Sequence, residues 1–334
     1  MNGRDGQLLS EVRITGREEL PDASRHLAWI DTTVFAGCDD GSITALDDQG
    51  ASRCLPHTVE HPVTAIAGNA ELLAVGAIDG AAIIVSRRGD AARLHPGSAV
   101  RSAVVIGHRA VFAAGDDLVV SSGSVEDAVP LGIGALTALT HVAGNLMLAG
   151  GVRGVAWFDV SFLAIDGRID LPTIVSASAD PRRRFVAAGD LGGSVHVLRP
   201  GVDEASELTG YPDRVALLAW TASGAGLCAT ADDELTVWRA TDEGLDDSEP
   251  VRLVAHDRAI TALAASPTSD LVATGDTGGD LYLWSPLRVD APVAHVNVDG
   301  VVLALAWSPS GRELVASTSM GELLRCTVLP GSIA

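Results

Sequence analysis

The sequence repeats one strand-and-turn pattern along nearly its whole length, and this periodicity constrains the fold more than any other feature. Near the C-terminus, Val302–Gly311 reads VLALAWSPSG; one period earlier, Ile260–Asp270 reads ITALAASPTSD; before that, Val215–Gly224 reads VALLAWTASG. Self-similarity at a period of about 40 residues indicates a modular array. We therefore expect function to lie on a surface built from loops rather than in one catalytic pocket.

Each unit combines an alternating first strand, an apolar second strand, a tight turn with Asp or Gly, and a third strand. A variable fourth strand leads to the next unit. The second strand and its turn occur eight times, at Val34–Gly41, Leu72–Gly80, Val111–Asp117, Leu146–Gly154, Phe185–Gly193, Leu227–Glu234, Leu271–Gly279 and Leu314–Gly321. Asp and Gly accept the positive φ that a tight hairpin turn requires. No stretch has helical periodicity over three turns, so the pattern predicts an all-β array with helix absent or marginal.

The two ends of the chain complement each other. The eighth unit ends near Leu329 and lacks a fourth strand, whereas the chain begins with a spare strand-like segment, Leu8–Gly16 (LLSEVRITG), before the first strand at Arg25–Ile30. We expect this N-terminal segment to complete the last unit. Closing the ring in this way removes two exposed sheet edges that would otherwise promote aggregation.

These repeats resemble the WD40-repeat β-propeller family. The resemblance is carried by LAWSPSGRELVAS at Leu305–Ser317, by AASPTSDLVATGDTGGDLYLW at Ala264–Trp284, and by His256-Asp257. It covers essentially the whole chain and implies one domain, residues 1–334, of eight four-stranded antiparallel blades. Eight units in 334 residues give about 42 residues each, within the range of about 40–45 for this repeat. A seven-bladed ring, with about 48 residues per unit, would leave one of the turns unassigned.

The chain departs from the family pattern at several positions. Trp238 and Trp284 hold the tryptophan late in the third strand. In other units the stand-ins are Leu46, Val85, Phe158, Leu198 and Cys326. The family's structural network joins a loop His, a Ser or Thr of the second strand, a turn Asp and the Trp. In unit seven the resemblance implies His256, Thr274 and Trp284 for this network, whereas Gly278 occupies the place of the Asp.

The composition limits the partners and the compartment. The formal charge is −20, which disfavours nucleic acid and anionic membranes as partners. The four cysteines have no metal-ligand spacing, and three lie in apolar runs, so we expect buried free thiols and a reducing cytoplasm. The N-terminal residues have neither the basic nor the apolar region of a signal peptide, so we expect none, and no window of 18 apolar residues predicts a membrane span. All 23 basic residues are arginine, which a GC-rich bacterial genome or selection against lysine modification would explain.

No catalytic or metal-binding motif accompanies the repeats. The nine histidines are scattered without HExxH or HxH spacing, and there is no GxSxG, P-loop or GxGxxG motif after a strand. Adjacent acids such as Asp39-Asp40 and Asp232-Asp233 fall in predicted turns, where they are solvated rather than facing each other across a substrate. We therefore predict a protein that is not an enzyme and has no cofactor or metal. The alternative, a propeller enzyme with its site in the central channel, stays open.

Basic residues precede or begin several first strands, at the place where we expect the mouth of the central channel. We call Arg25, His26, Arg101, Arg214 and Arg258 the collar. Arginine suits interface anchoring because its planar fork binds carboxylate or phosphate bidentately. The collar would receive an acidic or phosphorylated segment of a partner, or a partner's C-terminal carboxylate. The alternative is that the arginines pair with nearby turn acids, for which we name Asp213, Asp232, Asp257 and Asp276.

The sequence thus predicts a cytoplasmic, non-catalytic protein-interaction scaffold, either monomeric or a subunit of a hetero-complex. The partner is expected to be a protein or peptide. An adaptor or substrate-recognition subunit of an enzyme complex, such as a lysine-modifying one, is the alternative that the missing lysines favour. Neither follows from the fold alone, because one fold hosts many functions.

Overall fold

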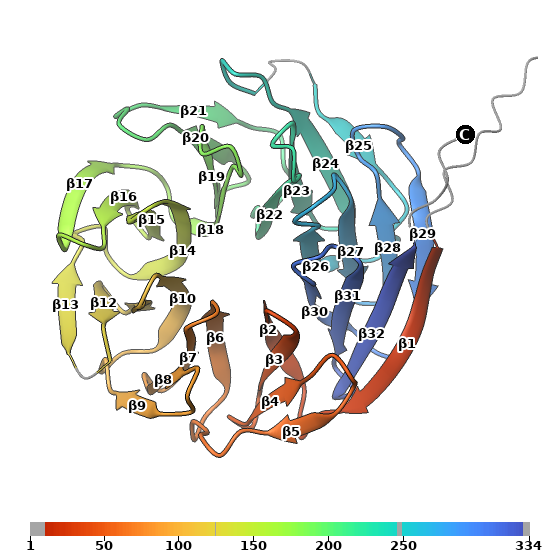
Figure 1. Cartoon of the computed structure of the whole chain (residues 1–334). Helices are drawn as coiled ribbons and strands as arrows, with labels where there is room; N and C mark the ends of the chain where they lie inside the picture. Colours follow the sequence, from red (N-terminus) through yellow and green to blue (C-terminus); the bar gives the residue numbers. More distant parts are fainter. Residues whose placement is uncertain (1–10, 124, 246–248, 330–334) are drawn as a thin grey trace, which may run out of the picture.

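Eight small sheets are arranged in a ring around a central channel (Figure 1). The computed structural model describes residues 11–123, 125–245 and 249–329. Each sheet has four antiparallel strands, and successive sheets follow one another around the ring. The predicted eight-bladed β-propeller is confirmed, and the seven-bladed alternative is wrong.

Blades one to four follow the chain order. Their strands are β2 (Ser24–Ile30), β3 (Thr33–Cys38), β4 (Ile43–Leu46) and β5 (Ser52–Cys54); β6 (Val63–Gly68), β7 (Leu72–Ala77), β8 (Ala82–Ser86) and β9 (Ala91–Leu94); β10 (Val100–Ile106), β11 (Arg109–Ala114), β12 (Asp117–Ser121) and β13 (Glu126–Pro130); β14 (Leu136–Ala143), β15 (Leu146–Gly151), β16 (Gly154–Asp159) and β17 (Ala164–Ile169).

Blades five to eight continue in the same way, and the N-terminal strand joins the last of them. Their strands are β18 (Ile174–Ala179), β19 (Val186–Asp190), β20 (Val195–Leu198) and β21 (Ala205–Leu208); β22 (Leu217–Trp220), β23 (Gly226–Ala231), β24 (Glu234–Arg239) and β25 (Val251–Leu253); β26 (Ile260–Ala265), β27 (Val272–Asp276), β28 (Asp280–Trp284) and β29 (Pro292–Asn297); β30 (Val302–Trp307), β31 (Glu313–Thr318), β32 (Glu322–Leu329) and β1 (Glu11–Glu19). Helix is absent from the described ranges, as predicted, so no helix there is long and apolar enough to cross a membrane.

The ring is closed by strand β1, which pairs antiparallel with β32 from Glu11 opposite Leu329 to Glu19 opposite Glu322. Beyond the strand, the Leu20 amide donates to the Gly321 carbonyl at 2.7 Å. The predicted closing strand is confirmed over the part of Leu8–Gly16 that is described, and it continues to Glu19. Leu8, Leu9 and Ser10 lie outside the described residues.

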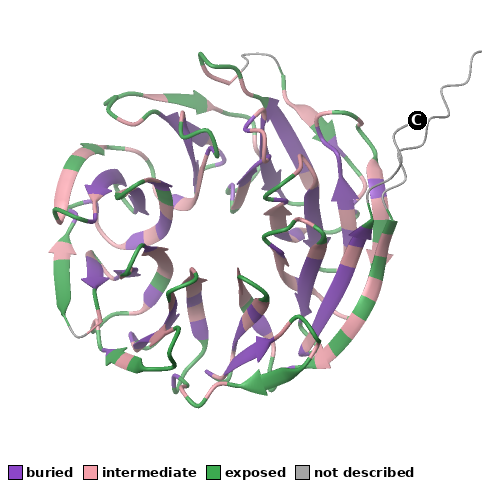
Figure 2. Cartoon of the chain, viewed as in Figure 1, coloured by how far each residue is buried: buried purple, intermediate pink, exposed green. Residues whose placement is uncertain are grey.

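Burial changes from the channel to the rim of every blade. The second strands are almost wholly buried, as in β7 and β11, whereas outer strands such as β1 alternate between exposed and half-buried residues (Figure 2). Apolar side chains therefore fill the spaces between neighbouring blades, and each blade depends on the next for its core. Three of the four cysteines, Cys38, Cys228 and Cys326, are buried free thiols, as the sequence predicted. Burial raises the pKa of Cys228 to about 12.

A close contact between a glycine and a branched side chain joins many blades. A Cβ atom on Gly275 of β27 would fall inside contact distance of the Val302 side chain, which is fully buried at the start of blade eight. The same arrangement recurs at Gly37 with Val63, Gly76 with Val100, Gly150 with Ile174, and Gly189 with Val215. In these five blades the glycine of the second strand therefore leaves the space that the first buried side chain of the following blade occupies.

A hydroxyl group supports this contact in several blades. In the first strand of these blades, the residue directly after the first buried residue has no partner in the second strand and forms a β-bulge. In blades two, four and seven that residue is Thr64, Thr137 or Thr261, and its hydroxyl donates to a backbone carbonyl of the following blade. For Thr261 the acceptor is the Val302 carbonyl at 2.5 Å. Each of these bonds ties two neighbouring sheets together beside the channel.

We expect Gly275→Ala to lower the free energy of unfolding by about 1–3 kcal/mol, because the added methyl overpacks against Val302. Urea unfolding measures this loss. Gly244→Ala is the matched control, since a Cβ there meets no atom within 4 Å. Val302→Ala should recover part of the loss in the double variant, so strictly additive losses would contradict this contact.

Candidate functional site

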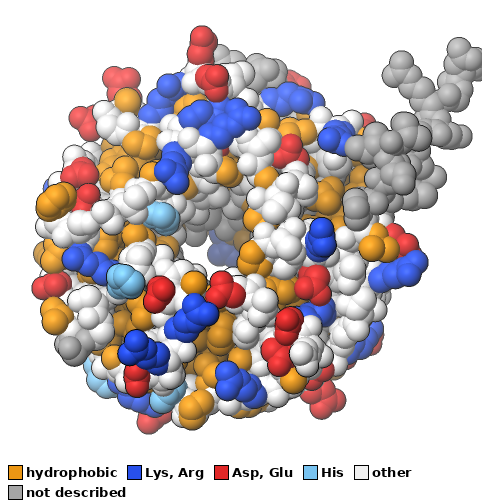
Figure 3. Space-filling model, viewed as in Figure 1, with side chains coloured by type: hydrophobic (Ala, Val, Ile, Leu, Met, Phe, Trp, Pro, Cys, Tyr) orange, Lys and Arg blue, Asp and Glu red, His pale blue; other side chains and the backbone are white. Residues whose placement is uncertain are grey.

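One face of the ring carries both the connections between blades and the turns between second and third strands. These segments lie together because antiparallel strands alternate in direction, so every second turn is on the same side. We call this side the loop face. It includes Asp39–Ser42 after β3, Thr277–Gly279 after β27, and the connections that lead into β2, β10 and β26. The channel opens at the centre of the ring, with acidic and basic side chains around it (Figure 3).

A cavity of about 290 Å³ lies in the wall of the central channel. Its lining residues come from the first strands of several blades and are Arg25, His26, Leu27, Ile66, Leu217, Thr261, Ala262, Leu263, Leu303, Ala304 and Leu305. Most of these side chains are aliphatic, and no carboxylate is among them. Two of the five collar residues, Arg25 and His26, line this cavity, whereas Arg101, Arg214 and Arg258 do not.

The collar residues do not share one position in their blades. Arg25 and Arg101 occupy the β-bulge position that threonine holds in blades two, four and seven. Arg214 lies one residue before the buried Val215, and Arg258 lies two residues before β26. The four arginines of the collar therefore form two pairs: one pair lies on the bulges of the inner strands and the other on the connections of the loop face. All four arginines are exposed.

Two collar arginines form ion pairs. The Arg25 Nε is 3.4 Å from Asp39 Oδ2, and the Arg258 Nε is 3.9 Å from Asp257 Oδ1. The predicted pairing with turn acids thus holds for Arg258 with Asp257. Arg25 pairs with Asp39, which we did not name as a partner. Among the described residues, Arg101 and Arg214 have no ion pair within 4.0 Å. Such exposed pairs stabilise little, so Arg25 and Arg258 can exchange their intramolecular acids for an acid of a ligand.

The other acids named as partners have different roles. The Asp213 carboxylate accepts a hydrogen bond from the backbone amide of Arg214 at 2.7 Å. Asp276 is fully buried and faces His256. Asp232 has a φ of 55° in the turn after β23 and has no ion pair among the residues the structure describes. The pairing hypothesis therefore accounts for half of the arginines and does not account for Arg101 or Arg214.

The imidazole of His26 is the titratable neighbour of Arg25 at the channel. Burial, with a smaller contribution from the Arg25 charge, lowers the pKa of His26 to about 4, and Asp39 opposes this shift. His26 is therefore neutral near pH 7. Arg25 then supplies the positive charge of a cavity that is otherwise aliphatic.

A buried chain of hydrogen bonds in blade seven corrects one sequence prediction. Trp284 Nε1 donates to Thr274 Oγ1 at 2.7 Å, and His256 Nε2 lies 2.6 Å from the same hydroxyl. His256 Nδ1 lies 2.6 Å from Asp276 Oδ2. We expected the aspartate of this network to be missing because Gly278 takes its place, and that expectation is wrong. Asp276, two residues earlier, completes the network and also accepts the amide of Gly278 at 2.8 Å.

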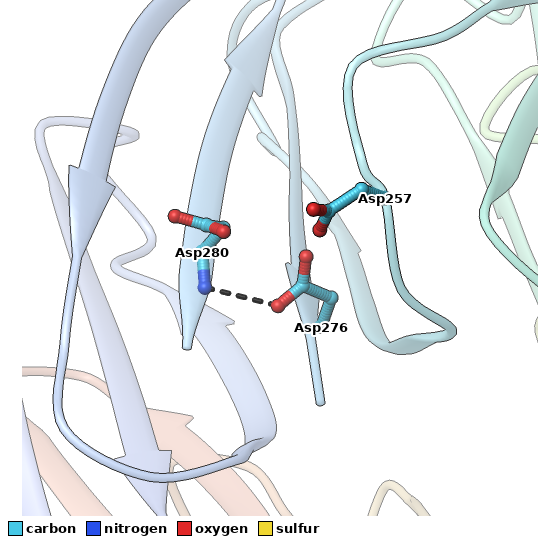
Figure 4. A group of neighbouring side chains, drawn as sticks. All are labelled: Asp257, Asp276 and Asp280. Carbon is cyan, nitrogen blue, oxygen red and sulfur yellow. Dashed lines mark hydrogen bonds between the residues drawn. The ribbon is translucent and has the colours of Figure 1, made fainter. Parts of the chain in front are cut away.

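The same aspartate belongs to a group of three carboxylates, Asp257, Asp276 and Asp280, which lie within 4.8 Å of one another (Figure 4). Each carboxylate already has partners. Asp276 binds His256 and two turn amides, and Asp257 lies by Arg258. Asp280 accepts hydrogen bonds from Asn297 at 2.8 Å and from His295 at 2.7 Å, which lower its pKa. We therefore assign this group a structural role in holding the turn of blade seven.

Sequence reasoning missed the apolar residues of the loop face. Ile78, Val152 and Leu191 are 44%, 41% and 55% exposed, and each directly follows the second strand of its blade. Met320, at the next position in blade eight, is 67% exposed. The sequence did contain a signal for them: the first position of the turn is apolar in these blades, whereas other blades have a polar residue there, such as Asp39 or Thr277. Exposed apolar side chains on a face that also carries exposed arginines are typical of a protein-binding surface.

Comparisons with known proteins agree with this architecture. Residues 248–285, which include β25 to β28, match the family model described as WD domain, G-beta repeat. No curated protein matches the sequence. A crystal structure of the computationally designed Ika8 protein is similar, with a TM-score of 0.77 and 20% identity over 96% of this chain and 99% of that one. At this identity the likeness concerns the fold alone.

We expect His256→Ala to lower the free energy of unfolding by about 2–4 kcal/mol, because it leaves the buried Asp276 carboxylate without its counterpart. Chemical denaturation monitored by tryptophan fluorescence measures this loss. His95→Ala, at an exposed histidine, is the control and should change stability by less than about 0.5 kcal/mol. Equal effects in both variants would rule out the network as a stabilising element.

We expect His26 to make stability fall as the pH drops from about 6.5 to about 4, because the unfolded chain takes up the proton first. Above pH 6.5 both states hold a neutral imidazole, and the contribution is complete. His26→Ala, which introduces the residue found at the matching positions Ala65 and Ala262, should show a smaller loss across this window. Urea midpoints at pH 7 and pH 4.5 give the comparison. Identical losses in the two proteins would contradict it.

Proposed function

Because this chain is a WD40-repeat β-propeller, we propose that it is a non-catalytic scaffold that binds a protein partner on its loop face. The WD40 fold is typically an interaction scaffold, and the rigid ring presents its turns and connections as one surface. Fold alone does not name the partner. The residues of the collar and the exposed aliphatic side chains beside it define the chemistry that a partner has to match.

The observation that carries the proposal is the channel cavity, which combines aliphatic walls with the single cation Arg25 and the neutral His26. A carboxylate near Arg25, followed by an aliphatic side chain in the channel, satisfies both parts of this lining. Arg101 and Arg214 would bind further acidic or phosphorylated residues of the same segment, because neither arginine has an ion pair among the described residues. We therefore propose a partner with an acidic or phosphorylated segment or an acidic C-terminus.

A second candidate follows from the composition. All 23 basic residues are arginine, so the chain offers no side-chain amine to a lysine-modifying enzyme. This favours an adaptor that holds substrates near such an enzyme in the cytoplasm without being modified itself. The two candidates differ in what co-purifies from the native cell extract, since an adaptor brings down an enzyme together with its substrates.

We expect Arg101→Glu combined with Arg214→Glu to reduce capture of the partner from native extract at least tenfold, because like charges then face its acidic segment. Quantitative mass spectrometry of the captured proteins measures this. The melting temperature should stay within about 1 °C, because both side chains are exposed. The control is Arg88→Glu with Arg312→Glu, two exposed positions on the opposite face with the same change in charge. Unchanged capture by the collar variant, or equal loss in the control, would refute the collar.

A further inference from the structure

The turn between β18 and β19 of blade five carries three consecutive arginines in a chain whose formal charge is −20. This segment, Asp180–Phe185, reads DPRRRF, and we call it the blade-five turn. It lies on the face opposite the loop face, because it joins a first strand to a second strand. None of the collar residues belongs to it, so a function of this turn is independent of the collar.

The same turn occurs in blades six and eight, at Thr221–Gly226 and Ser308–Glu313. In all three turns the amide of the first residue donates to the carbonyl of the last, and the amide of the fourth donates to the carbonyl of the first. The fourth residue is Gly224 in blade six and Gly311 in blade eight, with φ of 65° and 67°. In the blade-five turn it is Arg183, with φ of 63°. A left-handed backbone is disfavoured for residues with a Cβ, so glycine would suit this position better.

No contact within the folded chain compensates for the strain at Arg183. Leu163 also has a positive φ, of 50°, but its side chain packs against the core of blades three and four. Asp31 and Asp232 have positive φ as well, and aspartate tolerates this conformation. The Arg183 side chain is exposed and has no ion pair within 4.0 Å among the described residues. A strained residue that gains nothing from the fold indicates a role in binding.

Arg184, in contrast, has a structural role. Its Nε donates to the Oδ2 of Asp180, which is fully buried, at 2.7 Å. Its Nη2 donates to the Gly224 carbonyl at 2.6 Å, and its Nη1 donates to the Thr241 carbonyl and to Asp242 Oδ1, both at 2.9 Å. Arg184 thereby fastens blade five to blade six. Both carboxylates are bound by this one guanidinium, so the other two arginines of the turn keep their charges.

Three exposed arginines on two adjacent turns have no ion pair. Arg182 and Arg183 lie on the blade-five turn, and Arg199 begins the turn after β20. The Arg199 guanidinium is 4.7 Å from the centroid of the Phe185 ring, at the end of the blade-five turn. Over the part of the chain that the structure describes, none of the three has an acid within 4.0 Å. Asp180 accepts the Arg182 amide at 3.0 Å, which fixes the backbone that presents these charges.

The local charge is positive although the chain is acidic. The three unpaired arginines and Arg184, less the two carboxylates that Arg184 binds, give four minus two, or +2. The other acids of the second turn are Asp203 and Glu204, at its far end. Asp203 Oδ1 is 3.6 Å from the place of a Cβ on Gly167, in blade four. At physiological salt the Debye length is about 8 Å, so near neighbours outweigh the total charge in selecting a ligand.

We propose that the blade-five turn is a second docking site, for an extended acidic segment of a partner protein. Its carboxylates bind Arg182, Arg183 and Arg199, because a guanidinium fork matches a carboxylate bidentately. An extended segment suits these arginines because they lie on two turns. Nucleic acids and anionic membranes are disfavoured, since their phosphates would extend over a surface of the opposite overall preference. With the collar on the other face, one ring can hold two partners.

Fluorescence anisotropy with a labelled acidic peptide tests the site. The probe is fluorescein-Gly-Glu-Glu-Gly-Glu-Glu-Gly, and the matched peptide has Gln in place of every Glu. Binding is measured on the collar variant, Arg101→Glu with Arg214→Glu, because the collar is itself proposed to bind acidic segments. This variant should bind the Glu peptide saturably and at least tenfold more tightly than the Gln peptide. Absence of saturable binding, or equal affinity for both peptides, would overturn the docking site and leave the collar unaffected.

Charge reversal on the turn identifies the residues. Arg182→Glu with Arg183→Glu, added to the collar variant, should weaken binding of the Glu peptide at least tenfold. Arg88→Glu with Arg312→Glu is the control, at exposed positions on the same face and with the same change in charge, and should alter binding less than twofold. Equal losses in the two proteins would assign binding to net charge and overturn the site. So would an oligothymidine DNA that binds the collar variant as tightly as the Glu peptide does.

Arg183→Gly separates binding from stability. Glycine relieves the left-handed strain, so the urea midpoint should rise, whereas the Glu peptide should bind at least threefold more weakly. Arg183→Ala removes the same guanidinium and keeps the Cβ, so it should lose the same affinity without the rise in midpoint. A lower midpoint for Arg183→Gly would contradict the strain argument. Unchanged peptide binding in both variants would remove Arg183 from the site.

Discussion

The contact between neighbouring blades is the constraint on which the rest of this structure depends. A single four-stranded sheet of this size cannot bury both of its faces, so each blade has to supply the core of the next. In five of the eight blades a glycine of the second strand brings the neighbours into close contact, because its missing Cβ admits the Val302 side chain at Gly275 and its counterparts elsewhere. Threonine hydroxyls add directional bonds at the same place. The pairing of β1 with β32 joins the two ends of the chain in the last blade and closes the ring.

The positions that repeat by themselves could be predicted from the sequence. Second strands such as Val34–Gly41 combine apolar residues with a turn that needs glycine, and both features are local. Ring closure followed by counting strands, because the last unit lacks one and the first has one to spare. The buried cysteines followed from their apolar neighbours. The strands and the cysteines depend on residues adjacent in the chain, and ring closure depends on a count of such local elements.

Features that depend on side chains from different blades were less accessible. The sequence pattern placed the network aspartate at position 278, but the carboxylate of Asp276 reaches His256 from two residues away, and this became visible only in three dimensions. The collar was found as basic residues near first strands. Its division into bulge and connection positions depends on strand register, which a repeat pattern does not fix to one residue.

The candidate binding residues lie where individual blades depart from the repeat that holds the ring together. Arg25 and Arg101 occupy the bulge position at which Thr64, Thr137 and Thr261 bind the following blade. A threonine there adds a hydrogen bond between blades, whereas an arginine gives up that bond and places a cation at the channel. The exchange is tolerated because the buried contact of Val63 with Gly37 persists at the junction after Arg25. In an eightfold repeat, stability is distributed over many equivalent contacts, so single blades are free to lose one of them and to offer that position to a ligand.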